Sequence, residues 1–185
     1  IATLAIKLLE EKFGRFVNLS VLVIGTGEIG KLLLIYLKQK GVNTVIIANR
    51  TYNKALSLAG ELNCKIARFD GLAEELLNVD MVICSTSSPH LILREADLRK
   101  VMSGRKKPLF ILDLAVPRDV EESAKCISGV ILYNIDDLGY VIEENIKRRK
   151  EEAILAERII DKEIRNFVKI LWKKNVLLSA QGQAS

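Results

Sequence analysis

Short apolar runs alternate with amphipathic stretches along most of this chain. Val21–Ile24 and Asp80–Cys84 have the length and the nearly continuous apolar character of strands buried on both faces. Lys31–Gln39 and Asn53–Leu62 carry apolar residues at helical spacing. Further strands are expected at 44–48, 65–69, 109–112 and 130–133, and a short helix at 72–77. Strands that alternate with helices predict a parallel sheet with right-handed crossovers. We therefore expect an α/β fold, a doubly wound Rossmann domain with a long C-terminal helix.

Two helical patterns flank these alternating elements. Residues 1–13 carry leucines and a phenylalanine at helical spacing, and Gly14 ends that helix. From about Asp136, apolar residues recur at threes, fours and sevens, and no Gly or Pro follows Gly139 as far as Asn175. This pattern predicts one long helix over 136–175 whose apolar stripe requires a second surface. Two shorter helices folded back on the sheet are the alternative. We expect a Rossmann domain over 1–135, the long helix over 136–175 and a disordered tail over 176–185.

A glycine-rich turn follows the strand at Val21–Ile24. Gly25, Gly27 and Gly30 form the G-x-G-x-x-G pattern, which includes Thr26, Glu28 and Ile29. The first glycine permits a tight bend, the second lets the backbone approach a pyrophosphate, and the third lets helix and strand pack closely. Free N–H groups at the following helix start would face the phosphates. Because strand and helix flank the motif, it indicates dinucleotide binding rather than a glycine-rich turn that binds nothing.

The residues after the second strand predict which dinucleotide binds. An Asp or Glu at this position would bond the ribose 2′-hydroxyl of NAD and repel a 2′-phosphate. This chain has Asn49 there, followed by Arg50 and Thr51. A guanidinium can hold a phosphate with two parallel hydrogen bonds. The sequence therefore favours NADP over NAD, and Asn49 and Thr51 could also cap the next helix.

A polar segment leaves the strand that ends at Cys84. Ligands of open parallel sheets lie outside the carboxyl ends of the strands. We therefore expect Ser85 and Thr86 to meet the pyrophosphate or the nicotinamide ribose. Ser87 and Ser88 fit a polar loop that caps a helix near Leu93 equally well.

Composition narrows the class of protein further. The chain has 185 residues, a formal net charge of +5, three cysteines and one histidine. That charge allows a polyanionic partner without requiring one. Cys64, Cys84 and Cys126 are widely spaced, which indicates a reduced, cytoplasmic protein without a metal site. His90 is expected to be a loop residue. The longest apolar stretch is too short to cross a membrane.

Five segments together resemble the glutamyl-tRNA reductase family. They are GTGEIG at 25–30, ANRT at 48–51, STSSP at 85–89, DLAVPRD at 113–119 and LYNIDDL at 132–138. The last two are much more specific than the glycine motif. The resemblance covers nearly all of the chain, in order and spacing.

This resemblance implies a function for a longer protein. In that family, a cysteine of an N-terminal catalytic domain attacks glutamyl-tRNA to give a thioester. NADPH then delivers hydride to give glutamate-1-semialdehyde for tetrapyrrole and heme (porphyrin) biosynthesis. The family's catalytic domain would precede Ile1, and its dimerisation domain would follow about Val176. Implied partners are glutamyl-tRNA, a second copy of the protein and glutamate-1-semialdehyde aminomutase. We therefore expect this part of the chain to be inactive alone.

The same resemblance implies the cofactor contacts. Gly25 to Gly30 would bind the pyrophosphate, Asn49, Arg50 and Thr51 the 2′-phosphate end, and Ser85 and Thr86 the ribose. Asp113 and Ala115 would shape the nicotinamide pocket, and none of the cysteines has the role of nucleophile.

Three other interpretations compete with this one. The first is the Rossmann half of a shikimate dehydrogenase, which also uses an N-R-T turn. The second is a precorrin-2 dehydrogenase, for which an acid would be expected at Asn49. The third is a nucleotide-sensing module without chemistry, which an acid at the end of the second strand would favour.

Overall fold

The computed structural model describes residues 1–42 and 44–181, and within this range the side chains apart from those of 44–46, 140–146, 148–149, 168 and 171–181. Its strands are β1 (Ser20–Ile24), β2 (Thr44–Ala48), β3 (Lys65–Ala67), β4 (Met81–Cys84), β5 (Leu109–Asp113) and β6 (Val130–Asn134). Its helices are α1 (Ala2–Phe13), α2 (Glu28–Gln39), α3 (Tyr52–Leu62), α4 (Leu72–Asn78), α5 (Glu95–Gly104) and α6 (Asp137–Gln181), with short 3-10 turns η1 (Phe69–Gly71) and η2 (Glu122–Cys126).

The six strands form one parallel sheet in the order β3-β2-β1-β4-β5-β6. This is the strand order of the Rossmann fold, and it confirms the fold class expected from the sequence. Successive strands are added toward one edge of the sheet from β1 to β3, and toward the other edge from β4 to β6. The order therefore switches between β1 and β4, although these two strands are parallel. Side chains from the carboxyl ends of these two strands therefore meet beside a crevice, which is the usual ligand position in such sheets.

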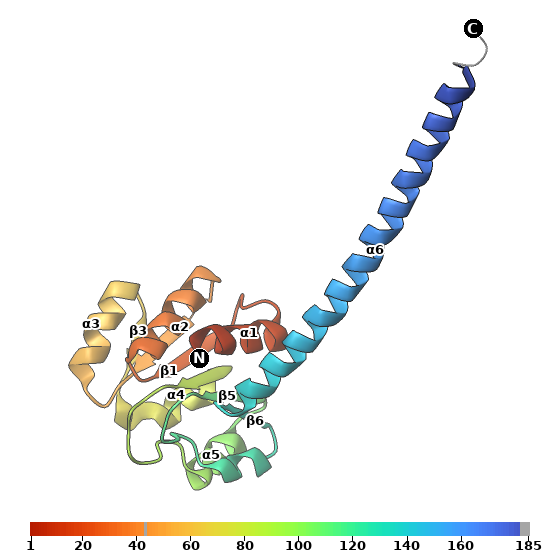
Figure 1. The fold of residues 1–185 in the computed structure, drawn as a ribbon. Helices are drawn as coiled ribbons and strands as arrows, with labels where there is room; N and C mark the ends of the chain where they lie inside the picture. Colours follow the sequence, from red (N-terminus) through yellow and green to blue (C-terminus); the bar gives the residue numbers. More distant parts are fainter. Residues whose placement is uncertain (43, 182–185) are drawn as a thin grey trace. The chain divides into compact units, whose positions relative to one another are not determined.

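Alternation along each strand supplies two separate cores. Val21 and Val23 of β1 face the core covered by α1, α2 and α3. Leu22 and Ile24 face the core covered by α4 and α5. Figure 1 shows the two sets of helices on opposite sides of the sheet. Because both faces are covered, the central strands are apolar throughout, which explains why the sequence shows continuous runs.

Helix α6 is continuous over 45 residues. It begins where Asn134 accepts hydrogen bonds from the N–H groups of Asp136 (3.0 Å) and Asp137 (3.1 Å), while the Asp137 carboxylate accepts one from the Asn134 N–H (2.7 Å). This reciprocal pair satisfies backbone donors at the helix start. The structure therefore agrees with the prediction of one long helix, and not with the alternative of two shorter helices.

The end of α6 differs from the sequence expectation. Residues 176–181 are helical, where a disordered tail was expected, because nothing between Gly139 and Gln181 breaks the pattern. The remainder of that tail, 182–185, lies outside the described residues.

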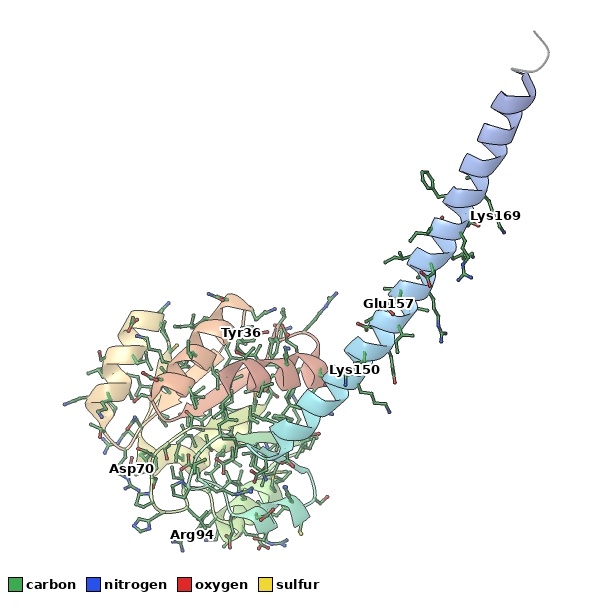
Figure 2. The ribbon with its side chains drawn as sticks, in the orientation of Figure 1. Tyr36, Asp70, Arg94, Lys150, Glu157 and Lys169 are labelled. Carbon is green, nitrogen blue, oxygen red and sulfur yellow. The ribbon has the colours of Figure 1, made fainter. Side chains whose placement is uncertain are left out.

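Large apolar side chains that the structure describes between residues 154 and 170 of α6 are exposed, for example Ile160 (57%), Phe167 (61%) and Ile170 (63%). Charged residues, including Lys150, Glu157 and Lys169, lie along the same helix (Figure 2). Contacts within the chain divide it into two compact units, residues 1–141 and 142–185.

Candidate nucleotide-binding cleft

A cleft of about 590 Å³ opens at the carboxyl ends of β1, β2 and β4. Its lining residues are Gly25, Thr26, Gly27, Glu28, Ile29, Asn49, Arg50, Thr51, Lys54, Phe69, Ser85, Thr86, Ser87, Ser88, Pro89 and Ile92. The structure therefore gathers ten of the thirteen residues that the sequence put forward. Gly30, Asp113 and Ala115 are not among the lining residues.

The glycine loop can adopt its shape only without side chains at two positions. Gly25 has φ +108°, and a Cβ there would lie 2.7 Å from the backbone oxygen of Ser85. A Cβ on Gly30 would lie 2.6 Å from the Gly25 oxygen and 2.7 Å from the Ser85 Oγ. Gly30 therefore lies beneath the cleft and lets α2 pack against the β1 turn. The first-turn N–H groups of α2 have no acceptor within the helix, so they remain available to an anion.

Asn49 connects the glycine loop to the loop after β2. Its Nδ2 donates to the Thr26 Oγ1, and its Oδ1 accepts from the Thr51 N–H at 2.8 Å. Thr51 stands at the N-cap position of α3 but makes no side-chain capping bond. The Asn49 amide therefore holds two walls of the cleft together, and it leaves no carboxylate at the end of β2.

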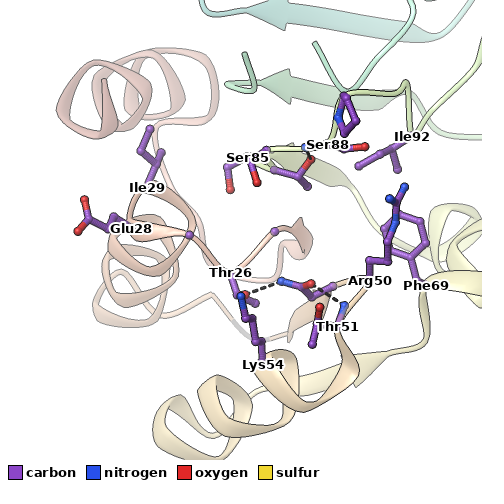
Figure 3. Close-up of a pocket in the computed structure, with 16 residues that line it drawn as sticks. Thr26, Glu28, Ile29, Arg50, Thr51, Lys54, Phe69, Ser85, Ser88 and Ile92 are labelled. Carbon is purple, nitrogen blue, oxygen red and sulfur yellow. Dashed lines mark hydrogen bonds between the residues drawn. The ribbon is translucent and has the colours of Figure 1, made fainter. Parts of the chain in front are cut away.

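Two cations lie beside this wall. The Arg50 guanidinium carbon lies 5.8 Å from the centre of the Phe69 ring. Arg50 and Lys54 form no ion pair with any residue that the structure describes. Figure 3 shows the Lys54 side chain reaching toward Thr26 and the Arg50 side chain lying along Phe69, with the Glu28 side chain directed away from both. This part of the cleft can therefore receive an anionic group.

The opposite wall follows β4. The Ser85 Oγ is buried without a hydrogen-bond partner among the described residues. Thr86 donates to Asp119 through both its N–H (3.0 Å to Oδ2) and its hydroxyl (2.5 Å to Oδ1). The Ser88 N–H donates to the Thr86 Oγ1 at 3.0 Å. Polar groups are therefore concentrated along this wall, and Ser85 has unused hydrogen-bonding capacity.

Asp113 does not line this cleft, and its expected part in shaping the nicotinamide pocket stays a prediction. It is 2% exposed, and its carboxylate accepts from the N–H groups of Ala115 (3.1 Å), Asp119 (3.0 Å) and Val120 (2.9 Å). Burial raises the pKa of Asp113, as it does the pKa of Asp119. Asp113 thus closes the loop after β5 and is turned away from the cleft, with Ala115 buried beside it.

Neither the three cysteines nor the histidine belongs to a group of metal ligands among the described residues. Cys84 is fully buried, and this burial raises the pKa of its thiol well above the ordinary value. Cys64 and Cys126 are free, and the described residues contain no group of ligands able to hold a metal. His90 is exposed in the loop after β4. No described helix is both long and apolar enough to cross a membrane.

Sequence reasoning missed Lys54, Phe69 and Ile92 in the cleft. Lys54 lies on the first turn of α3, directly after the Asn49–Thr51 segment, so the helix expected from residue 53 could have pointed to it. Phe69 follows β3 and Ile92 follows the β4 loop, and neither carries a motif. Only the tertiary structure brings these two apolar side chains to the cleft.

The strand order and the cleft at the β1/β4 crevice define a Rossmann-type nucleotide-binding domain. The chain belongs to the shikimate / quinate 5-dehydrogenase family, whose model matches residues 7–141.

Curated relatives that are about 40% identical to this chain are glutamyl-tRNA reductases. The one from Sulfurihydrogenibium sp. (strain YO3AOP1) is 42% identical over 167 residues, which are 90% of this chain and 38% of the relative. The chain spans about two fifths of the length of the curated relatives it matches. The resemblance stated from the sequence is therefore confirmed.

Solved structures give the same result. The glutamyl-tRNA reductase from Methanopyrus kandleri is 37% identical with a TM-score of 0.73, over 92% of this chain and 43% of that one. The nucleotide binding domain of the Thermoplasma volcanium glutamyl-tRNA reductase has a TM-score of 0.59 at 19% identity, over 81% of this chain and 96% of that one. The second likeness shows the fold alone.

Proposed function

We propose that this chain is the NADPH-binding domain of a glutamyl-tRNA reductase. The observation that carries the choice of cofactor is the end of β2. The Asn49 amide occupies the position of the acid that would bind an NAD ribose, and Arg50 and Lys54 lie next to it without ion-pair partners among the described residues. A 2′-phosphate would meet two cations there, with Asn49 in place of a carboxylate at the end of β2.

The rest of the cleft suits a dinucleotide. In this proposal the pyrophosphate lies over the glycine loop at the start of α2, and the nicotinamide half lies beside Ser85 and Thr86. The Ser85 Oγ, buried without a described partner, would gain a hydrogen bond from bound cofactor. Bound NADPH supplies hydride, and these residues orient it.

For the whole protein, we propose reduction of glutamyl-tRNA to glutamate-1-semialdehyde. The thioester cysteine would belong to another domain, because Cys84 is buried as a high-pKa thiol and neither Cys64 nor Cys126 lines the cleft. A second copy of the protein, glutamyl-tRNA and glutamate-1-semialdehyde aminomutase are the partners in this proposal, and the compartment is the cytoplasm. Residues 1–135 would form the cofactor domain and 136–175 the connecting helix.

A second candidate is the cofactor half of an NADP-dependent shikimate or quinate dehydrogenase. The family match over residues 7–141 favours it. The relatives at about 40% identity favour the reductase. The test that separates the two is turnover of the whole protein with glutamyl-tRNA against turnover with shikimate.

Arg50→Ala tests the cofactor site. We expect it to weaken NADPH binding by about ten- to a hundredfold, because a charge-assisted contact contributes about 1.5–3 kcal/mol. NADH binding should change little, since NADH lacks the 2′-phosphate. Calorimetric titration with each cofactor measures both effects.

Arg99→Ala is the matched control for this substitution. It removes the same charge from α5, where Arg99 pairs with Glu95 at 2.7 Å, outside the cleft. An equal loss of NADPH and NADH affinity in Arg50→Ala, with Arg99→Ala unchanged, would remove Arg50 from the phosphate site.

A further inference from the structure

Two buried carboxylates lie beneath the β4 wall of the cleft without a cation. Asp113 is 2% exposed and Asp119 is 0% exposed. Neither forms an ion pair with a described residue. Burying a carboxylate costs free energy unless donors satisfy it, and here N–H and O–H groups do so. The position of both carboxylates is therefore set by the loops that supply these donors.

The two carboxylates connect the loop after β5 to the loop after β4 through a chain of hydrogen bonds. Asp113 at the end of β5 accepts from the backbone N–H of Asp119 at 3.0 Å. The Asp119 side chain in turn accepts both the N–H and the hydroxyl of Thr86. Its backbone oxygen accepts from Ile92 (2.7 Å) and Leu93 (3.0 Å) at the far end of the same loop. Asp119 therefore holds the segment 86–93 at both ends.

Asp119 also fixes the orientation of the Thr86 side chain. The Thr86 hydroxyl is directed at Asp119, and its methyl lies 3.1 Å from the position that a Cβ on Gly25 would take. With its hydrogen donated to Asp119, the Thr86 Oγ1 is free to accept, and it accepts from the Ser88 N–H. One carboxylate thus sets the rotamer of Thr86 and the backbone of the loop that follows it.

We propose that Asp119 is a positioning residue of the cleft, which acts through Thr86 to hold the β4 wall in the shape that receives the nicotinamide half of the dinucleotide. The proposal rests on the proposed function for the identity of the ligand. It assigns Asp119 no contact with the cofactor, because Asp119 is fully buried and is not among the lining residues. Loss of its carboxylate should therefore weaken NADPH binding by changing the shape of the β4 wall, and not by removing a contact with the cofactor.

The test compares Asp119→Asn and Thr86→Val with their double variant. Asparagine keeps the shape of Asp119 but has one acceptor atom in place of two, and valine keeps the shape of Thr86 without the hydroxyl. We expect each to weaken NADPH binding about tenfold, as for one charge-assisted hydrogen bond. The double variant should lose no more than Asp119→Asn alone, because the Thr86 hydroxyl is one of the two Thr86 donors that this carboxylate holds. Thr86→Ser, which keeps the hydroxyl, should stay within about threefold of the unsubstituted chain.

Glu121→Gln is the matched control. Glu121 lies two residues from Asp119, and its carboxylate accepts from the Glu95 N–H at 2.7 Å, at the start of α5 and outside the cleft. It should leave NADPH affinity unchanged. Affinity losses that add in the double variant, or unchanged affinity in Asp119→Asn, would overturn the proposal.

A second measurement does not depend on the cofactor. Amide hydrogen exchange at Thr86 and Ser88 should become faster in Asp119→Asn, while the β4 amides 82–84 keep their protection. Unchanged exchange at Thr86 and Ser88 would contradict the positioning role even if the unsubstituted chain failed to bind NADPH. That failure would count against the proposed function alone.

Discussion

Gly30 is the residue at which the packing of the cleft is tightest. A methyl group there would lie within 2.7 Å of both the Gly25 oxygen and the Ser85 Oγ. We expect Gly30→Ala to destabilise the fold by about 1–3 kcal/mol, as overpacking does. It should also abolish measurable NADPH binding, because the glycine loop must move. Thermal unfolding and calorimetry measure the two effects.

Gly60→Ala on α3 is the control for Gly30→Ala. Nothing lies within 4 Å of the added methyl, so alanine should stabilise the helix by about 0.5–1 kcal/mol. If Gly30→Ala left stability and NADPH binding as little harmed as Gly60→Ala does, the glycine loop would not be as closely packed as in the structure.

Residues that line the cleft could be predicted where a motif fixes the backbone. The glycine loop and the residues after β2 and β4 came from the sequence because strand ends determine their place. Asp113 did not follow this rule. The sequence puts it at the end of β5, yet its carboxylate turns back to the N–H groups of the following loop. Which way a side chain turns after a strand depends on donors that only the tertiary structure brings near.

Helices α1 and α2 are joined by a small polar cluster at the surface. The Glu10 carboxylate accepts from the Tyr36 hydroxyl (2.5 Å) and from the Lys40 ammonium (2.9 Å). The bond from Tyr36, followed by that from Lys40, lowers the pKa of Glu10 below its ordinary value. A lowered folded-state pKa means that the carboxylate stabilises the fold above about pH 4.5, and that this contribution is lost as the pH falls through the folded pKa.

Glu10→Gln should therefore destabilise the chain at pH 7, and this destabilisation should shrink as the pH falls below about 4.5. The expected loss at pH 7 is about 0.5 kcal/mol, because the cluster is largely exposed. Thermal unfolding of both chains across this range measures the difference, and Glu11→Gln on the same helix is the control. An unfolding difference that did not shrink as the pH falls would show that Glu10 acts through something other than its charge.

The elements themselves followed closely from the sequence. Strands β2 and β6 begin and end within one residue of the expected positions, because their apolar runs are bounded by turn residues. Strand β3 is shorter than expected, since Phe69 belongs to the 3-10 turn η1 and lines the cleft. An aromatic residue after a strand has the same pattern whether it continues the strand or leaves it.

At the scale of the whole molecule, residues 1–141 contain every residue that lines the cleft. The fold class, a parallel sheet of the doubly wound Rossmann type, was predictable from the sequence, because alternating strands and helices allow few topologies. The exposed apolar stripe of α6 was predicted to need a second surface, and that remains a prediction. The sequence of one chain does not specify which surface covers a stripe, since any complementary apolar face would do so.

The central claim is that this cleft binds NADPH in preference to NADH. Calorimetric titration of the unsubstituted chain with the two cofactors, side by side in one buffer, tests it most directly. We expect NADPH to bind at least about tenfold more tightly, which is the contribution of one charge-assisted contact to the 2′-phosphate. Equal affinities, or tighter binding of NADH, would contradict the account.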